Sequence, residues 1–245
     1  WTWLQQETLM RLSFTPFAGE KALAFDPGQY VKVMMSNGIS IPCYIANSPR
    51  EDGLCTVYIE RTDDEVFDLF EWNIQRKREL WISGPLGECS LKLILENKAP
   101  LIIIAEDIRV TAAKALLEKI LLEHRNQFVH LFWGVKDFES ALMHDLFHAW
   151  QQRTAKLRYT LVLDKPCEPY VSGVPHQAFI KEYPDLRGHQ ILICARDATA
   201  VSAQSICLQH GAHPDRVLSD KLRRAERQKE RMVALIKADE EACEV

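Results

Sequence analysis

The sequence predicts an α/β plus all-β fold, in which an N-terminal six-stranded antiparallel barrel precedes an open parallel α/β domain. Short β-rich runs separated by turn sequences fill the first hundred residues, and strand-like runs alternate with helix-like runs after Lys98. The length of 245 residues is also enough for two domains of roughly 100 to 150 residues each. We place the boundary at a polar turn, so that the domains cover residues 1–97 and 98–222.

The β-rich runs lie at residues 9–14, 30–35, 39–46, 54–60, 79–83 and 90–95. The turn sequences between them are Asp26-Pro27-Gly28, Asn37-Gly38, Glu51-Asp52-Gly53 and Gly84-Pro85-Leu86-Gly87. Glycine, proline, asparagine and aspartate favour the backbone conformations of tight turns. Six short strands at nearly even spacing are typical of a small antiparallel barrel.

The second half of the chain alternates between two apolar periods. Continuous apolar runs predict buried strands at residues 101–105, 129–133, 158–163 and 191–195. Helical apolar spacing predicts helices at residues 111–124, 141–152, 174–183 and 198–210. Because strand–helix–strand units build parallel sheets, we expect an open parallel sheet with helices on both faces.

Residues 223–245 form a third, strongly charged segment. The sequence predicts a helix there, capped by Ser219 or Asp220. Its narrow apolar stripe comprises Leu222, Ala225, Met232, Val233 and Ile236. The stripe either packs on its own domain or docks against a protein partner.

Composition and spacing disfavour several classes of function. The formal charge of −4 provides no basic field for nucleic acid. Apolar runs such as residues 100–105 are far shorter than the ~20 residues of a membrane span, and no signal peptide is visible, which predicts a cytoplasmic location. The seven cysteines include no Cys-x-x-Cys pair, and His144 and His148 lack a third ligand nearby, so no metal is expected. No Gly-x-Ser-x-Gly or His-Glu-x-x-His sequence points to a hydrolase.

Several motifs follow one another in a fixed order along residues 5–222. They are Phe25-Asp26-Pro27-Gly28-Gln29-Tyr30-Val31, residues 41–49, Gly84-Pro85-Leu86-Gly87, residues 100–105, Phe132-Trp133-Gly134-Val135-Lys136, residues 191–195 and Arg216-Val217-Leu218-Ser219-Asp220. With these motifs the chain resembles the ferredoxin-NADP reductase family, and its flavin reductase branch in particular. The resemblance implies a flavin-binding barrel, an NAD(P)-binding α/β domain and hydride passage between a nicotinamide and a flavin.

The resemblance also identifies the positions that would grip the flavin ring. The family's Arg-x-Tyr-Ser run corresponds to Ile41, Pro42, Cys43 and Tyr44, so its three gripping residues are replaced. A shift of one residue places Tyr44 where the stacking aromatic belongs. Cys43, Tyr44 and Asn47 are therefore the candidate flavin-binding residues, and Tyr44 is either a platform for the ring or an ordinary tyrosine.

The family's flavin-phosphate turn corresponds to Glu60-Arg61-Thr62-Asp63-Asp64-Glu65. Carboxylates at a helix N-terminus satisfy the helix dipole and repel phosphate. This sequence disfavours FAD or FMN held through phosphate more than it disfavours free flavin.

The nucleotide-binding loop of the family has changed as well. Its Ala-Gly-Gly-Thr-Gly sequence, in which glycines let backbone amides approach a pyrophosphate, is replaced here by Ala105-Glu106-Asp107-Ile108-Arg109. By the same resemblance, Arg109, Lys136 and Cys194 are the candidate residues for contact with the nucleotide. We therefore expect no tightly bound cofactor, with free flavin and NAD(P)H bound weakly.

Two functions stay open on the sequence. The chain is either a reductase-like protein with degenerate cofactor sites that serves as a binding or assembly subunit, or an active NAD(P)H-dependent flavin or electron-transfer oxidoreductase. The replaced loops favour the first, and the motifs preserved along the chain favour the second. Under the first function, the charged C-terminal helix is the candidate contact for a protein partner.

Overall fold

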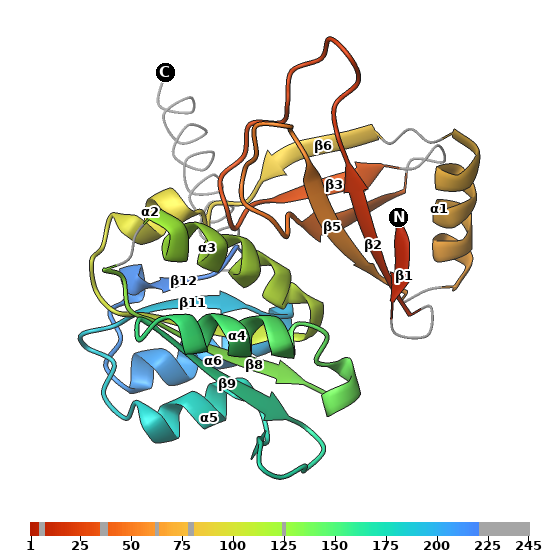
Figure 1. Cartoon of the computed structure of the whole chain (residues 1–245). Coiled ribbons are helices and arrows are strands. Elements are labelled where there is room, and N and C mark those ends of the chain that lie inside the picture. The colour runs from red at the N-terminus through yellow and green to blue at the C-terminus, as the bar shows by residue number, and fades with distance from the viewer. Residues whose placement is uncertain (5–7, 35–38, 62–63, 78–80, 124–125, 221–245) are drawn as a thin grey trace, which may run out of the picture.

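The computed structural model describes residues 1–4, 8–34, 39–61, 64–77, 81–123 and 126–220. The first six strands in these ranges form two antiparallel sheets of three strands each (Figure 1). One sheet has the order β1 (Thr2–Leu4), β2 (Leu9–Phe14), β5 (Cys55–Glu60), and the other has the order β4 (Ser40–Tyr44), β3 (Tyr30–Met34), β6 (Trp81–Leu86). An isolated antiparallel bridge between Ile45 and Val57 connects the end of β4 to β5.

Alternating side chains explain why these segments are strands. In β3, Val31 and Val33 are buried whereas Lys32 and Met34 are exposed, which is the period of two that a half-buried strand requires. Helix α1 (Asp64–Lys77) adds apolar side chains to the core that both sheets share. The core side chains include Met10, Val31, Ile45, Val57, Phe67 and Phe70.

Residues 90–95 are a helix and not the sixth strand that the sequence predicts. Helix α2 (Leu91–Leu95) buries Leu91 and Ile94 on one side. Its first turn is fixed by two distant partners, since Leu91 N donates to Pro27 O at 2.9 Å and Lys92 N donates to the Asp26 carboxylate at 2.9 Å. An apolar run of six residues fits either period, so tertiary hydrogen bonds decide between helix and strand here. Strand β1 was not predicted.

The second half of the chain builds one parallel sheet with six strands in the described residues. Its order is β10 (Val171–Ser172), β9 (Leu157–Leu163), β8 (Val129–Val135), β7 (Leu101–Glu106), β11 (Gln190–Cys194), β12 (Val217–Leu218). The parallel sheet that the sequence predicts is thus confirmed. The motif at residues 216–220 includes β12, an edge strand that the apolar pattern alone did not indicate.

Helices cover both faces of this sheet (Figure 1). Helices α3 (Val110–Glu123) and α4 (His144–Arg153) pack with Leu101 and Ile103 on one face. Helices α5 (Pro175–Glu182) and α6 (Asp197–Gln209) pack with Ile102 and Ile104 on the other. β7 is buried on both faces, which explains its continuous apolar sequence.

The strand order reverses between β7 and β11. From β7 the chain builds outward through β8, β9 and β10, and then returns to place β11 on the other side of β7. In open α/β sheets, such a switch point opens a crevice at the carboxyl ends of the two strands. Glu106 and Cys194 end these strands and therefore lie at the crevice.

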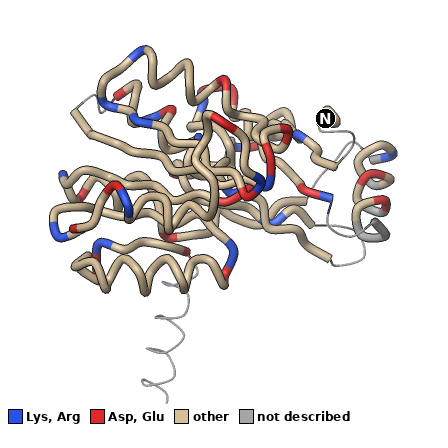
Figure 2. Tube along the Cα trace, turned by 90° about the horizontal axis from the view of Figure 1, so that it is seen from below, with Lys and Arg blue, Asp and Glu red and all other residues tan. Residues whose placement is uncertain are grey.

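Acidic and basic residues are interspersed along the described chain (Figure 2). Within that part, no helix has both the length and the apolar character needed to cross a bilayer. The predicted C-terminal helix, with its apolar stripe, lies outside the described residues, which end at Asp220.

Candidate functional site

A cavity of about 370 Å³ lies where the antiparallel sheets meet the crevice of the parallel sheet. We call it the Tyr44 cavity. Its walls come from both halves of the chain and include Tyr30, Tyr44, Tyr58, Arg109, Thr111 and Asp220. This volume is within the usual range of small-molecule sites, about 300–1,000 Å³.

Tyr44 is held in place by strand β4 and by two neighbours, one polar and one aromatic. Its phenol donates a hydrogen bond of 3.2 Å to Oδ2 of Asp220, and its ring meets that of Tyr30 edge-on with centroids 5.8 Å apart. Burial, followed by the charge of Asp220, raises the pKa of Tyr44 well above its usual value. The phenol therefore stays protonated and acts as a donor.

Cys43 contributes to the lining of the Tyr44 cavity, but its side chain points to the other face of the same strand. Its side chain is 3% exposed in the core of the antiparallel sheets, and burial raises the pKa of its thiol to about 12. Because side chains alternate, Pro42 and Tyr44 share the other face of β4. Tyr44 lines the Tyr44 cavity from this face, and its role as the stacking aromatic stays a prediction.

Asp220 is a site residue that sequence reasoning used only as part of a motif and as a possible helix cap. Besides Tyr44, its carboxylate accepts hydrogen bonds from the backbone amides of Glu88 at 2.9 Å and Cys89 at 3.1 Å. Gly87 has a φ of 96°, and a Cβ there would lie 3.1 Å from both carboxylate oxygens. The Gly-Pro-Leu-Gly motif therefore makes room for Asp220, a contact between residues more than 130 positions apart.

Cys194 ends β11 and is 5% exposed. Burial, with a smaller contribution from the charge of Asp220, raises the pKa of its thiol far above the usual value. The thiol is therefore protonated. Cys194 does not line the Tyr44 cavity, whereas its neighbour Ala195 does. Thr111 also lines this cavity, and its hydroxyl donates a hydrogen bond to Ile108 O at 2.9 Å.

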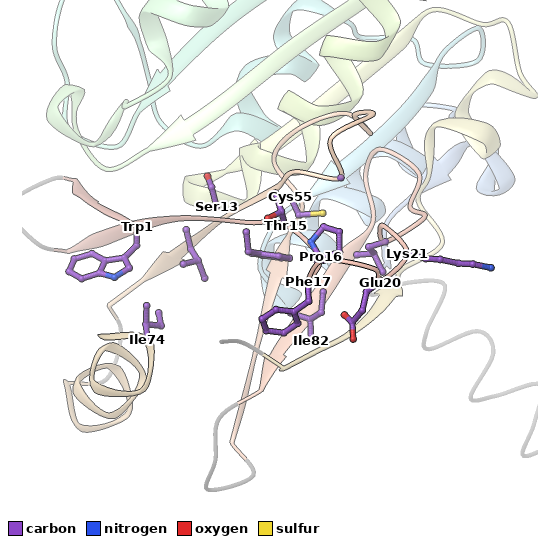
Figure 3. A pocket seen from close by; sticks show the side chains of 15 residues that line it. Trp1, Ser13, Thr15, Pro16, Phe17, Glu20, Lys21, Cys55, Ile74 and Ile82 are labelled. Atoms are coloured by element: carbon purple, nitrogen blue, oxygen red, sulfur yellow. The ribbon is translucent and has the colours of Figure 1, made fainter. Parts of the chain in front are cut away.

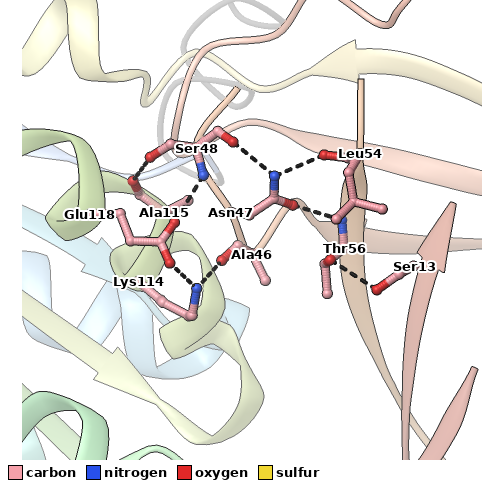
Figure 4. A network of polar contacts seen from close by, with 9 residues as sticks. All are labelled: Ser13, Ala46, Asn47, Ser48, Leu54, Thr56, Lys114, Ala115 and Glu118. Carbon is pink, nitrogen blue, oxygen red and sulfur yellow. Dashed lines mark hydrogen bonds and ion pairs between the residues drawn. The ribbon is translucent and has the colours of Figure 1, made fainter. Parts of the chain in front are cut away.

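Asn47 has a different environment (Figure 4). Its amide nitrogen donates to Ser48 O and Leu54 O at 2.8 and 2.9 Å, and its amide oxygen accepts from Thr56 N at 2.7 Å. These bonds brace the connection between β4 and β5. A direct role of Asn47 in cofactor binding stays a prediction.

A second cavity, of about 490 Å³, adjoins the first. We call it the Lys136 cavity. It shares Glu60 and Ile108 with the Tyr44 cavity, and Lys136 enters its wall from the carboxyl end of β8. Arg109 lines the Tyr44 cavity instead. The structure thus brings Tyr44, Arg109 and Lys136 to two neighbouring cavities.

The two carboxylates that replace the glycine loop are bound by one arginine. Glu106 accepts hydrogen bonds from Arg196 N at 2.9 Å and Thr199 Oγ1 at 3.2 Å, at the start of α6. The Arg196 guanidinium pairs with Asp107 and, at 3.4 Å, with Glu106. Burial raises the pKa of the Asp107 carboxyl, and Arg196 opposes that shift. This pairing was not predicted from the sequence.

A larger cavity, of about 780 Å³, lies in the first half of the chain, among the antiparallel sheets, helix α1 and the loops between them (Figure 3). Its apolar walls include Trp1, Leu12, Phe14, Phe17, Ile74 and Ile82. No residue of the parallel sheet or its loops lines it within the described part of the chain. It therefore lies apart from the switch point, where the candidate residues converge.

Comparison with known proteins gives relatives over most of the chain, although no family model matches. A CDP-6-deoxy-L-threo-D-glycero-4-hexulose-3-dehydrase reductase of Yersinia pestis is 24% identical over 215 residues, covering 86% of this chain and 63% of that protein. A probable flavin reductase of Vibrio harveyi is 24% identical over 212 residues, covering 82% and 88%. An NAD(P)H-flavin reductase of Vibrio harveyi is 21% identical over 210 residues with the same coverage. Other relatives are named as the electron transfer component of a toluate 1,2-dioxygenase and the reductase subunit of an aromatic O-demethylase.

Solved structures show the same fold. The Amycolatopsis reductase GcoB superposes with a TM-score of 0.74 at 20% identity, covering 87% of this chain and 65% of that one. A ferredoxin NADP+ reductase from Neisseria gonorrhoeae superposes with a TM-score of 0.68 at 14% identity, covering 86% and 91%. The chain thus spans 63% of the length of the Yersinia relative but nearly the whole of smaller reductases.

These findings correct one expectation. The sequence led us to expect no tightly bound cofactor, because the gripping residues are replaced. The relatives are flavin and NAD(P)H reductases, and the Neisseria structure holds bound FAD and NADP, so that expectation is wrong. It assumed that the lost motif residues have no substitutes, whereas Tyr44 faces the cavity and Arg196 binds the new carboxylates.

The comparisons also favour an active reductase over a silent subunit. In sequence and in fold, the relatives of this chain are ferredoxin-NADP reductase-like and flavin reductase proteins, as its motifs predict.

Proposed function

We propose that this protein is an NAD(P)H-dependent flavin-binding oxidoreductase, in which the flavin ring occupies the Tyr44 cavity and the nicotinamide nucleotide occupies the Lys136 cavity. The observation that carries the proposal is that the two cavities share Glu60 and Ile108 at the switch point. Hydride transfer requires donor and acceptor atoms about 3–3.5 Å apart, so the two sites must adjoin.

The residues of the Tyr44 cavity fit a flavin ring. Tyr30, Tyr44 and Tyr58 provide aromatic surface, and Lys32 and Arg109 provide hydrogen-bond donors of the kind that a flavin's carbonyl and ring nitrogen atoms accept. When bound, the flavin supplies hydride and one-electron chemistry. The protein binds and orients the ring, and the walls of the cavity limit its contact with water.

Asp220 positions the walls of this cavity. Its carboxylate fixes the phenol of Tyr44 and the backbone at Glu88 and Cys89 at the same time. Cys194 contributes a small, protonated side chain at the end of β11, beside Ala195 of the cavity wall. In this proposal Tyr44 and Arg109 contact the flavin, and Asp220 acts through Tyr44. Cys194 lines neither cavity, so its contact with the nucleotide stays a prediction.

The Lys136 cavity suits the phosphate groups of a dinucleotide. Lys136 is exposed at the carboxyl end of β8, and Arg196 follows the carboxyl end of β11. Both residues line the cavity. Parallel sheets bind dinucleotides at this edge. Two cations that line one cavity offer charge to a pyrophosphate and to a second phosphate.

The domain division follows from this assignment. We propose that the two antiparallel sheets are the flavin-binding barrel of a domain over residues 1–97, and that residues 98–222 are the NAD(P)-binding domain. Relatives named as reductase subunits of oxygenase and demethylase systems support a protein electron acceptor. Docking of such a partner through residues 223–245 and a cytoplasmic location stay predictions.

The test is a flavin and nucleotide titration of the purified chain. FAD, FMN and riboflavin are added in turn, and the flavin absorbance band and the quenching of flavin fluorescence are followed. NADPH or NADH is then added without oxygen. Binding of one flavin per chain and bleaching of its band support the proposal. If flavin neither binds nor bleaches, in a protein that circular dichroism shows to be folded, the proposal is contradicted. That result favours the alternative, a binding or assembly subunit without redox activity.

Tyr44→Ala and Tyr183→Ala form a matched pair for this titration. Tyr44 lines the cavity, whereas Tyr183 packs against His130 and Phe132 on the α5 face of the parallel sheet. We expect flavin affinity to fall about tenfold in the first variant, because the loss of an aromatic contact costs about 0.5–1.5 kcal/mol beyond buried area. The second variant should bind flavin as the unaltered protein does.

A further inference from the structure

Arg196 joins the ends of the two strands that form the switch point. Its backbone amide and guanidinium bind Glu106, which ends β7, and the guanidinium also pairs with Asp107 in the next position. Arg196 itself comes two residues after the end of β11. One side chain therefore spans the crevice in which a dinucleotide would lie.

The two carboxylates are not equivalent. Glu106 also accepts hydrogen bonds from the hydroxyl of Thr199 and from the backbone amide of Arg196, just before α6, so it has partners without the guanidinium. The Asp107 carboxylate accepts a hydrogen bond from the guanidinium of Arg196. Asp107 is also the one non-glycine residue of the described ranges with a left-handed backbone, at a φ of 47°. Its backbone is held there because its carbonyl accepts a bond of 2.9 Å from Trp133 Nε1.

The guanidinium is accessible as well as paired. The side chain of Arg196 is 59% exposed, and both Arg196 and Asp107 line the Lys136 cavity. Guanidinium forms paired, parallel hydrogen bonds with phosphate oxygens as it does with carboxylate oxygens, so an anion that enters this cavity can compete with Asp107 for Arg196.

We propose that Arg196 is the pyrophosphate-binding residue of the nucleotide site and that it exchanges partners, leaving Asp107 for the nucleotide while Glu106 stays bound to the start of α6. The inference rests on the proposed function and names how the site replaces the lost glycine loop. Asp107 then acts as a counter-ion that keeps Arg196 in place across the crevice until an anionic nucleotide arrives. The same carboxylate sets the affinity, since it competes for the guanidinium.

The exchange predicts that substitutions of Arg196 and Asp107 change the affinity for NADPH in opposite directions. Arg196→Ala removes the cation, and NADPH affinity should fall at least about tenfold, the loss that corresponds to one charged hydrogen bond of 1.5–3 kcal/mol. Asp107→Asn keeps the size of the side chain but removes the competing charge, so NADPH affinity should rise several-fold. A variant that only misfolds cannot bind more tightly, so the second substitution keeps the test valid if the first one destabilises the protein.

The experiment measures dissociation constants by calorimetry for NADPH and for reduced nicotinamide mononucleotide, which lacks the pyrophosphate. Arg196→Ala should weaken NADPH much more than the mononucleotide. Arg187→Ala is the matched control, because Arg187 forms a similar exposed pair with Asp185 and neither residue lines either cavity. It should leave both constants unchanged.

The outcomes separate this inference from the proposed function. Unaltered protein that binds NADPH, together with unchanged binding in Arg196→Ala or weaker binding in Asp107→Asn, overturns the exchange and leaves the proposed function standing. Equal losses for NADPH and the mononucleotide overturn the assignment to the pyrophosphate. Unaltered, flavin-loaded protein that binds no nicotinamide nucleotide overturns both.

Discussion

The phenol of Tyr44 donates a hydrogen bond of 3.2 Å to Oδ2 of Asp220, although 176 positions separate the two residues. The bond connects the end of β4 to a residue two positions after the edge strand β12 of the parallel sheet. The same carboxylate binds the amides of Glu88 and Cys89. One side chain thus fixes the relation between three chain segments around the Tyr44 cavity.

Removing only the hydroxyl of Tyr44 should separate its two roles. In Tyr44→Phe we expect the free energy of unfolding to fall by about 1 kcal/mol, the usual net contribution of one hydrogen bond. Flavin affinity should change little, because the ring remains. Urea denaturation and flavin titration measure the two quantities. A loss of flavin binding as large as in Tyr44→Ala would show that the hydroxyl, and not the ring, matters to the flavin.

A polar clamp holds helix α3 against the segment after β4 (Figure 4). Lys114 Nζ donates to Ala46 O at 2.8 Å and pairs with Glu118, whose other oxygen accepts from Ser48 N at 3.0 Å. Ser48 Oγ donates to Ala115 O at 3.1 Å. Lys114→Met leaves partly buried acceptors without a donor, so we expect stability to fall by about 1–3 kcal/mol.

The control for the clamp lies on the same helix. Lys119 and Glu123 form an ion pair of the same spacing, but the Glu123 side chain is 52% exposed. Exposed pairs of this kind contribute about 0.3–0.5 kcal/mol, so Lys119→Met should have a small effect on urea denaturation. Equal effects of the two substitutions on the free energy of unfolding would mean that the contacts between α3 and the segment after β4 add no stability.

Gly28 belongs to the Asp-Pro-Gly turn that the sequence singled out. Its φ is 98°, and a Cβ there would lie 2.3 Å from the carbonyl oxygen of Cys89. Gly28→Ala should lower the free energy of unfolding by more than about 2 kcal/mol, through backbone strain and the clash together. Gly188→Ala is the control, since nothing lies within 4 Å of its added Cβ. Similar melting temperatures for both variants would contradict the reading of this turn.

His130 should make the stability of the protein pH-dependent. It is buried between Phe132 and two hydroxyls, those of Tyr183 and Thr160, each 2.9 Å from a ring nitrogen. Burial first, and then the charge of Arg158, lowers its pKa to about 3, although Glu182 lies 3.9 Å away. The folded pKa is below that of the unfolded chain, about 6.5, so stability is lost as the pH falls below 6.5.

Between pH 7 and pH 5 this linkage amounts to about 2 kcal/mol of unfolding free energy. His130→Gln retains a polar side chain but does not titrate, so its stability should fall by that much less over the same interval. His148→Gln, at an exposed position of α4, serves as the control. Parallel pH profiles for the unaltered protein and His130→Gln, measured by urea denaturation, would rule out the effect.

The sequence by itself determined the class of fold and most of its elements. The apolar periods predicted β2 at residues 9–14 with the bounds that the structure has, and predicted β7, β8, β9 and β11 within about two residues at most ends. These segments have sequences with one consistent period, so local pattern and tertiary packing agree. The order of the motifs also identified the kind of protein to which the chain is related.

Tertiary structure alone decided the site. Whether residues 90–95 form a strand or a helix depended on bonds to Asp26 and Pro27, more than 60 positions away. The direction of Tyr44 depended on the register of β4, and the partner of Tyr44 lies in the other half of the chain. Glu106 and Asp107 look like unpaired charges in the sequence because Arg196, which binds them, lies about 90 positions away. A linear pattern records which side chains are present, but the pairing of charges and the walls of a cavity arise only when distant strands meet.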